Sequence, residues 1–364
     1  MQQAPNHHLL TSYHEILRKL EQPDSLLNEE IDAVDQIHKS ILDTDHLTAD
    51  EKKRLKQEMT GYGPLDELLN REDLTEIMIN GHNEIWLEQR GQIQRHPEGF
   101  LCPHSYEQFL LRMSNEAQLQ ANLDRPFANG VWNRFRVHLL RPPLVSGETH
   151  VSLRYRPRSP WTLHRLQDLN WAEPDRISFI KRLIDTKKSL LIVGPTGSGK
   201  TAVLNACLQH TPAIERTICI EDTDEIVLPN ALSAKLLTRV DPHGHLRDFD
   251  QSDLIVQSLR MRPDRIVVGE VRGGEAKDLL MALATGHQGG MGTLHADSAR
   301  QALLRLEMLI QLGAPHWKIE AIRHLIGLSI QYIIVVEKSF GERKLKGIHR
   351  LASVEATGVL LEEV

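Results

Sequence analysis

The chain has 364 residues, with 43 lysines and arginines against 49 aspartates and glutamates, a formal net charge of −6. Because single hydrophobic cores rarely grow beyond about 250–300 residues, this length predicts two domains. The composition, 40% hydrophobic and 25% charged, excludes collagen, coiled-coil rods and wholesale disorder, and no run approaches the ~20 apolar residues that span a bilayer.

The first 58 residues are predicted to be an acidic helical extension. Residues 1–60 contain 7 lysines and arginines against 12 acids, and apolar residues recur at helical spacing over 9–20 and 31–41. A break is expected near Pro23. Two interpretations are open, a cap on the chain's own domain or a docking arm for a partner. We favour the cap, because amphipathic helices usually bury their apolar stripe on their own chain.

Residues 59–157 are predicted to be a small α/β domain. Its expected elements, in chain order, are a short helix over 65–69 and strands over 76–79, 84–87, 135–140 and 150–155, with turns at Asn80-Gly81 and Arg90-Gly91.

Arginine is the dominant cation of the region 101–170, which holds nine arginines and no lysine. The planar guanidinium suits bidentate contacts with phosphate or carboxylate better than an ammonium does. Those on or beside the predicted strands are Arg134, Arg136, Arg141, Arg154, Arg156 and Arg158. Most of them are expected to be structural, and which of them contacts a ligand is open at this point.

Prolines 157, 160 and 174 mark residues 158–175 as an interdomain linker. From 176 to 364 strand-like and helix-like segments alternate, which is typical of a parallel α/β sheet.

A phosphate-binding loop follows the first strand of this second domain. The apolar run 189–193 leads into a GxxxxGK[ST] motif and then into a helical segment, the context that the motif requires. Its members are Gly194, Pro195, Thr196, Gly197, Ser198, Gly199, Lys200 and Thr201. The backbone N–H groups of such a loop surround a phosphate, the lysine reaches the β- and γ-phosphates, and the Thr201 hydroxyl can bind Mg²⁺. ATP and Mg²⁺ are therefore the expected ligands.

Carboxylates and histidines follow the later strands of the same sheet. An acidic cluster over 221–225 follows one strand, and Glu270 follows the strand 265–269. Because the carboxyl ends of parallel strands face the nucleotide, such a carboxylate can hold Mg²⁺ or activate water. His287 and His295 lie eight residues apart, without the further ligands of a zinc site. We expect His295 to sense phosphate or to bridge active-site segments, and we leave a structural role open for both.

These motifs, in this order, resemble the secretion ATPases of type II and type IV systems and type IV pili. The resemblance covers residues 60–364 and rests on four segments, 194–201, 220–225, 259–272 and 285–296. Within the family, the segments 61–65, 74–81 and 262–266 are most similar to the CpaF/TadA branch, which drives tight-adherence pili.

The resemblance implies a homohexamer with a RecA-like ATPase domain and a smaller N-terminal α/β domain. It implies that Glu225 is the general base and that Glu270 is the Walker B carboxylate, which shares Mg²⁺ with Thr201. Arg136 and Arg154 are similar to family arginines that reach the γ-phosphate. Where the family typically has Asp-Gly-Ser-Arg-Val, this chain differs over 132–137, which leaves Arg134 and Arg136 as alternatives.

The predicted function is a Mg²⁺-dependent ATPase motor that powers pilus assembly or protein secretion across the bacterial envelope. The three cysteines lack CxxC spacing, and no secretory signal opens the chain, so a cytoplasmic enzyme is expected, peripheral at the inner membrane through a platform protein. Alternatives are a type IV secretion channel ATPase, a pilus-retraction ATPase and, in another class, a nucleic-acid-dependent RecA-like motor. The mild acidity weighs against a nucleic-acid partner.

Overall fold

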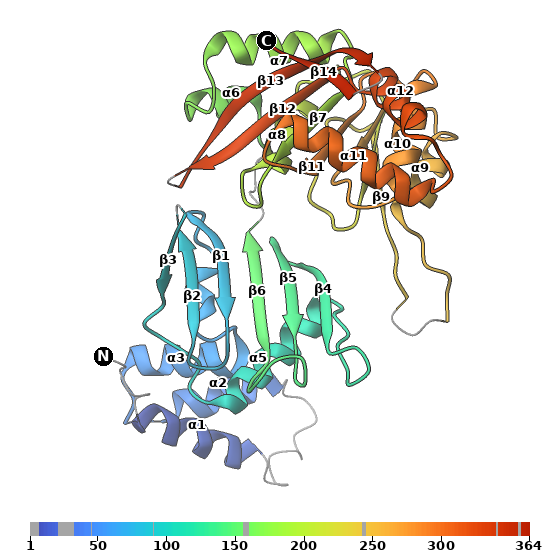
Figure 1. Ribbon diagram of the computed structural model, residues 1–364. Coiled ribbons are helices and arrows are strands. Elements are labelled where there is room, and N and C mark those ends of the chain that lie inside the picture. Colours follow the sequence, from blue (N-terminus) through green and yellow to red (C-terminus); the bar gives the residue numbers. More distant parts are fainter. Residues whose placement is uncertain are drawn as a thin grey trace. The chain divides into compact units, whose positions relative to one another are not determined.

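The computed structural model describes residues 7–20, 33–44, 46–89, 91–155, 160–241, 245–339, 341–355 and 358–364. The chain divides into two compact units, residues 1–157 and residues 158–364 (Figure 1). Each unit has its own sheet and its own hydrophobic core, and each is described by itself. None of the described helices is long and apolar enough to cross a membrane.

Three helices open the first unit: α1 (His7–Leu20), α2 (Ala33–Leu42) and α3 (Ala49–Thr60). Their apolar side chains share a core with Leu101 and Cys102 from the α/β part of the unit. The stripe is thus buried on the chain itself, as the cap interpretation requires. Helix α3 also runs across the predicted boundary at residue 58, so the extension is continuous with the domain. The break expected near Pro23 lies outside the described residues.

The sheet of the first unit is antiparallel, with strand order β3-β2-β1-β6-β5-β4. The bounds of its strands are β1 Leu74–Ile79, β2 Ile85–Gln89, β3 Gln92–Arg95, β4 Phe127–Trp132, β5 Phe135–Leu140 and β6 His150–Tyr155. The predicted strands 135–140 and 150–155 are confirmed with the same bounds, and the predicted short helix is α4 (Leu65–Leu68).

One face of this sheet is buried against helix α5 (Pro103–Glu116). Tyr106, Phe109 and Met113 of the helix pack on alternate strand residues such as Ile77 and Val137. Because successive strand residues point to opposite faces, the residues between them belong to the other face. That face carries the arginines of β5 and β6.

The second unit contains an eight-stranded sheet with the order β14-β13-β12-β7-β11-β10-β8-β9. Six strands are parallel, and a β13–β14 pair extends the sheet in antiparallel fashion beside β12. The strand bounds are β7 Leu190–Gly194, β8 Thr217–Glu221, β9 Ala234–Leu237, β10 Arg265–Val268, β11 Met291–His295, β12 Tyr332–Ser339, β13 Glu342–Glu355 and β14 Gly358–Glu363. The predicted α/β class is confirmed.

Helices cover both faces of the central strands. Successive strand residues such as Leu191 and Ile192 therefore belong to two different hydrophobic cores, one on each face of the sheet. One layer contains α6 Leu163–Asp168, α7 Pro174–Asp185 and α8 Lys200–Leu208; the other contains α9 Gln251–Ser258, α10 Glu275–Ala284, α11 Ala299–Gly313 and α12 Ile319–Ser329.

The predicted linker over 158–175 is wrong for its described part. Residues 160–175 contain α6 and the start of α7, and Leu163, Leu166 and Trp171 are buried in the core of the second unit. Prolines suggested a flexible connection, but Pro174 instead opens helix α7 at its first turn, where the absent N–H costs nothing.

Candidate nucleotide site

The phosphate-binding loop connects the buried strand β7 to helix α8. Gly197 and Gly199 have φ angles of 73° and 91°, a region that favours glycine, and Gly199 is the N-cap of α8. A Cβ at Gly194 would lie 2.4 Å from the carbonyl oxygen of Val336, so the neighbouring strand β12 leaves no room for a side chain there. The loop conformation therefore depends on these glycines.

Lys200 joins the loop to two later strands through His295. Its Nζ donates to the carbonyl oxygens of Gly194 and Pro195, each at 3.0 Å, and lies 3.1 Å from His295 Nδ1. Because an ammonium only donates, Nδ1 accepts, and the ring proton is on Nε2. That nitrogen lies 2.5 Å from Glu270 Oε1. Three residues that the sequence placed on separate segments are thus in contact.

The Glu270 carboxylate stays charged in a partly buried position. Burial works to raise its pKa, but the hydrogen bond and charge of Arg272, with His295 and Lys200, outweigh burial and lower it. Burial, assisted by the charge of Lys200, lowers the pKa of His295 against the opposing effect of Glu270, which favours the neutral ring. Oε1 of Glu270 is buried and, despite the contact with His295, has no partner with hydrogen-bond geometry.

This carboxylate and the Thr201 hydroxyl fit a magnesium ion in the chemistry of their donor atoms. Hard cations such as Mg²⁺ prefer oxygen ligands and are usually held by one or two protein groups plus phosphate oxygens and water. Within the described parts of the chain, no group of three histidines, cysteines or acids could hold a metal alone. The two predicted ligands would therefore act together with a bound nucleotide.

The acidic cluster after β8 divides into residues with different partners. Glu221 is 3% exposed and accepts hydrogen bonds from the backbone N–H groups of Glu225 and Ile226. Burial raises its pKa to about 7. Asp224 pairs with Lys235. Glu225 itself is half-buried, on the loop that Glu221 anchors. The predicted base thus depends on a neighbour to which the sequence assigned no separate role.

Two polar side chains that the sequence analysis missed hold the site segments together. Asn205 on α8 accepts from the backbone N–H of Val227 at 2.8 Å, while its amide donates to the Thr201 carbonyl at 3.1 Å. Thr293 donates to the Gly269 carbonyl at 2.6 Å and so ties β11 to the end of β10. Both are polar residues within apolar runs, a signal that can be found in a sequence.

His287 lies apart from this arrangement. Its Nδ1 is 3.1 Å from the carbonyl oxygen of Ala282 in α10, a local contact at the end of that helix. Of the two histidines, His295 is the one in contact with predicted site residues.

In the first unit, the structure brings Arg136 and Arg154 together. They face each other across β5 and β6, and Glu76 is the neighbour of Arg154 on β1. Like charges directly opposite each other on a sheet are unfavourable, and the charge of Arg154 also acts on the Glu76 carboxyl, whose pKa it works to lower against the effect of burial. Arg134 is engaged elsewhere, because it donates to the Leu69 carbonyl and its guanidinium lies 5.0 Å from the ring centre of Tyr155.

Two other candidate arginines lie outside the described residues, Arg156 and Arg158. Arg141 pairs with Glu107 at 3.6 Å on the surface of the first unit.

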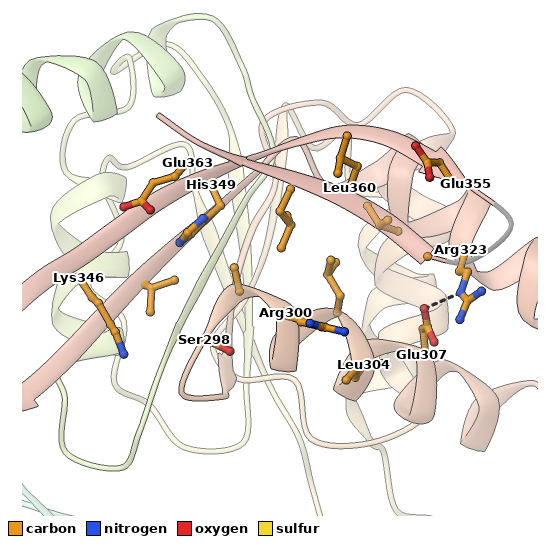
Figure 2. A pocket seen from close by; sticks show the side chains of 16 residues that line it. Ser298, Arg300, Leu304, Glu307, Arg323, Lys346, His349, Glu355, Leu360 and Glu363 are labelled. Atoms are coloured by element: carbon orange, nitrogen blue, oxygen red, sulfur yellow. Dashed lines mark hydrogen bonds and ion pairs between the residues drawn. The ribbon is translucent and has the colours of Figure 1, made fainter.

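A groove of about 650 Å³ lies between α11 and the strands β12–β14 of the second unit. Figure 2 shows its lining, with the ion pair between Arg323 and Glu307 at one end and Lys346 and His349 at the other. The residues that line it include none of the predicted site residues, so the chemistry of the phosphate-binding loop lies elsewhere.

Comparison with known proteins agrees with this geometry. Residues 112–338, more than half of the chain, match the family model described as "Type II/IV secretion system protein". The type IV secretion system protein PtlH of Bordetella pertussis is 31% identical over 300 residues, covering 75% of this chain and 88% of PtlH. The conjugal transfer protein TrbB of Rhizobium radiobacter is 31% identical over 283 residues, covering 76% of this chain and 83% of TrbB.

Among solved structures, the pilus retraction motor PilT with bound ADP is similar in fold, with a TM-score of 0.56 and 22% identity, covering 78% of this chain and 80% of PilT. That likeness confirms the RecA-like two-domain fold class. From the family model and the relatives together, the chain belongs to the type II/IV secretion system protein family.

Proposed function

We propose that the protein is a Mg²⁺-dependent ATPase that powers a secretion or pilus machine. The observation that carries the proposal is the contact of Lys200 with His295 and of His295 with Glu270, beside a complete phosphate-binding loop. This arrangement joins groups that lie on or directly after three strands. They are the lysine of the loop, the charged carboxylate of Glu270 and a histidine with a lowered pKa.

In the proposed mechanism, water attacks the γ-phosphorus in line, the bond to the β,γ-bridging oxygen breaks so that ADP leaves, and Glu225 accepts the proton of the water. Lys200 moves from the loop carbonyls to the β- and γ-phosphate oxygens and balances their charge. Mg²⁺, when bound through Thr201 and Glu270, supplies further charge neutralisation. His295 contacts both Lys200 and Glu270. A movement of Lys200 on nucleotide binding therefore changes the surroundings of His295 and, through it, of the Glu270 carboxylate.

Arg136 and Arg154 are proposed to stabilise charge on the transferred phosphoryl group, as an arginine finger does. The proposal rests on their likeness to the family arginines, and the two residues are direct neighbours across β5 and β6. Replacing either by alanine should then lower kcat while ADP affinity stays unchanged, with Arg141→Ala as the matched control.

The working form is proposed to be a homohexamer, peripheral at the inner membrane through a platform protein. Tight-adherence pilus assembly, as in the CpaF/TadA branch, type IV secretion and pilus retraction are the candidate machines. The second is favoured by the names of PtlH and TrbB, which are a type IV secretion system protein and a conjugal transfer protein.

Phosphate release by the purified full-length chain tests the proposal. Wild type should hydrolyse ATP only with Mg²⁺, and Lys200→Ala and Glu225→Gln should abolish turnover without loss of folding. Glu362→Gln, which changes an exposed glutamate paired with Arg350, is the control. Undiminished turnover in Lys200→Ala contradicts the assignment. Hydrolysis that requires added DNA or RNA and falls steeply with salt would favour a nucleic-acid motor instead.

A further inference from the structure

The β12–β13 hairpin runs alongside the phosphate-binding loop. Strand β12 is the parallel neighbour of β7, with Val335 opposite Val193, and continues through Ser339. Four residues beyond Val335 extend it by about 13 Å, at the usual rise per residue of a strand. The hairpin therefore passes the point where β7 ends and the loop begins, and Figure 1 shows it projecting from the sheet.

Two cations of the hairpin lie against the loop. Lys338 on β12 and Arg343 on β13 are directly opposite each other. Arg343 Nε donates to the carbonyl oxygen of Gly197 at 2.9 Å. Its Cδ would be 3.3 Å from a Cβ at Gly199, and Lys338 Nζ would be 3.9 Å from a Cβ at Gly197. The contact is thus with the two glycines whose φ angles are positive.

This contact has a consequence for the N–H groups of the loop. A trans peptide directs its C=O and its N–H to opposite sides, so a Gly197 carbonyl held by Arg343 directs the Ser198 N–H away from the hairpin. That N–H donates to the Pro195 carbonyl at 3.3 Å, whose oxygen also accepts from Lys200. Arg343 therefore holds the outside of a loop that Lys200 contacts from within.

We propose that Arg343 is a positioning residue for nucleotide binding, which holds the Gly197 carbonyl toward the hairpin and so keeps this oxygen away from the bound phosphates. Lys338 adds positive charge at the same place. The inference rests on the proposed function, because the ligand is the polyphosphate of ATP or ADP. It concerns affinity, since Arg343 acts on the loop and not on the attacking water.

Equilibrium titration of the full-length chain with ADP and with ATP, together with kcat and KM, tests this inference. Arg343→Ala should weaken binding of both nucleotides about tenfold, the loss expected for one charge-assisted hydrogen bond, with kcat changed by less than about twofold. Arg343→Lys should recover part of the affinity. Lys344→Ala is the matched control, because this neighbour on β13 pairs with Glu342 at 2.7 Å.

A thermal-unfolding comparison separates positioning from a general structural role. Arg343→Ala should unfold at the wild-type temperature without nucleotide and show a smaller stabilisation by ADP. Wild-type affinity in Arg343→Ala, an equal loss in Lys344→Ala, or a fall in kcat with KM unchanged would each overturn the inference while the proposed function stands. A wild-type chain that binds neither nucleotide would instead overturn the proposed function.

Discussion

The ends of strands β8 and β10 carry the same kind of residue in opposite environments. Glu221 ends β8 and Glu270 follows β10, and the two strands are parallel neighbours in the sheet. Burial raises the pKa of Glu221 to about 7, whereas Arg272, His295 and Lys200 overcome burial and lower the pKa of Glu270. One carboxyl accepts from backbone N–H groups, and the other contacts Arg272 and His295.

The difference shows that an acid at the end of a strand beside a nucleotide loop is not by itself a site residue. The partners of each carboxyl decide its role, because they determine whether it is charged and what it can bind. Glu221 organises the loop that presents Glu225, while Glu270 has an oxygen directed at His295, the neighbour of Lys200. Substitutions at and around the two carboxyls can break or sharpen this contrast.

Replacing Glu270 by Gln should have the largest effect. Loss of the carboxylate should lower kcat by about 10²–10⁴-fold, which corresponds to the several kcal/mol that a bound metal ion contributes to charge stabilisation. The fold should be kept, because glutamine has the same size and keeps an oxygen toward Arg272. Phosphate release and thermal unfolding measure both. Full activity in Glu270→Gln would show that hydrolysis does not need this carboxylate, so that Glu270 would not differ from Glu221 in function.

Replacing Glu221 by Ala should lower the free energy of unfolding by about 2–4 kcal/mol, because backbone N–H groups of the acidic loop lose their buried acceptor. Lys235, 3.6 Å from the carboxyl, loses a partner as well. Denaturant unfolding measures the loss. The control is Asp222→Ala, which removes the next acid along the chain; its side chain is exposed, so the variant should be near wild type.

The pH dependence of stability should differ between Glu221→Gln and wild type. Because the folded pKa of Glu221 is raised from 4.5 to about 7, the folded state binds the extra proton between these values. The stability that Glu221 gains from this extra proton is therefore full below pH 4.5. It is lost as the pH rises to about 7, by up to about 3 kcal/mol. Glu221→Gln should flatten this slope. Glu270 has a lowered pKa, so it contributes stability above pH 4.5 that is lost in acid, the opposite dependence. A stability that rises with pH between pH 5 and 7 would therefore contradict the raised pKa of Glu221.

Replacing Asn205 by Ala should have the smallest effect of the four, a loss of about 1–2 kcal/mol for the acceptor of the Val227 N–H. Because Asn205 joins α8 to the acidic loop, kcat should fall moderately while the affinity for ADP is kept. Gln209→Ala, which removes an exposed contact with the Val227 carbonyl, is the matched control. Equal losses of stability and kcat in both variants would show that the hydrogen bond of Asn205 with the Val227 N–H has no specific role.

The first unit shows which features sequence patterns can predict and which they cannot. Strands 135–140 and 150–155 were predicted with correct bounds because alternation of apolar and polar residues is a local signal. The pairing of Arg136 with Arg154, by contrast, depends on strand register, and Arg134 was separated from Arg136 only by its contacts with Leu69 and Tyr155.

The sequence by itself indicated the loop 194–201, because the whole motif, with the two glycines of positive φ, lies within eight consecutive residues. It also determined the α/β class, since strand and helix periodicities are local. Only the tertiary structure decided that 160–175 belongs to the second unit, that Glu221 is structural, and that Arg343 contacts the loop. Burial and partners come from residues far apart in the chain, so no local pattern contains them.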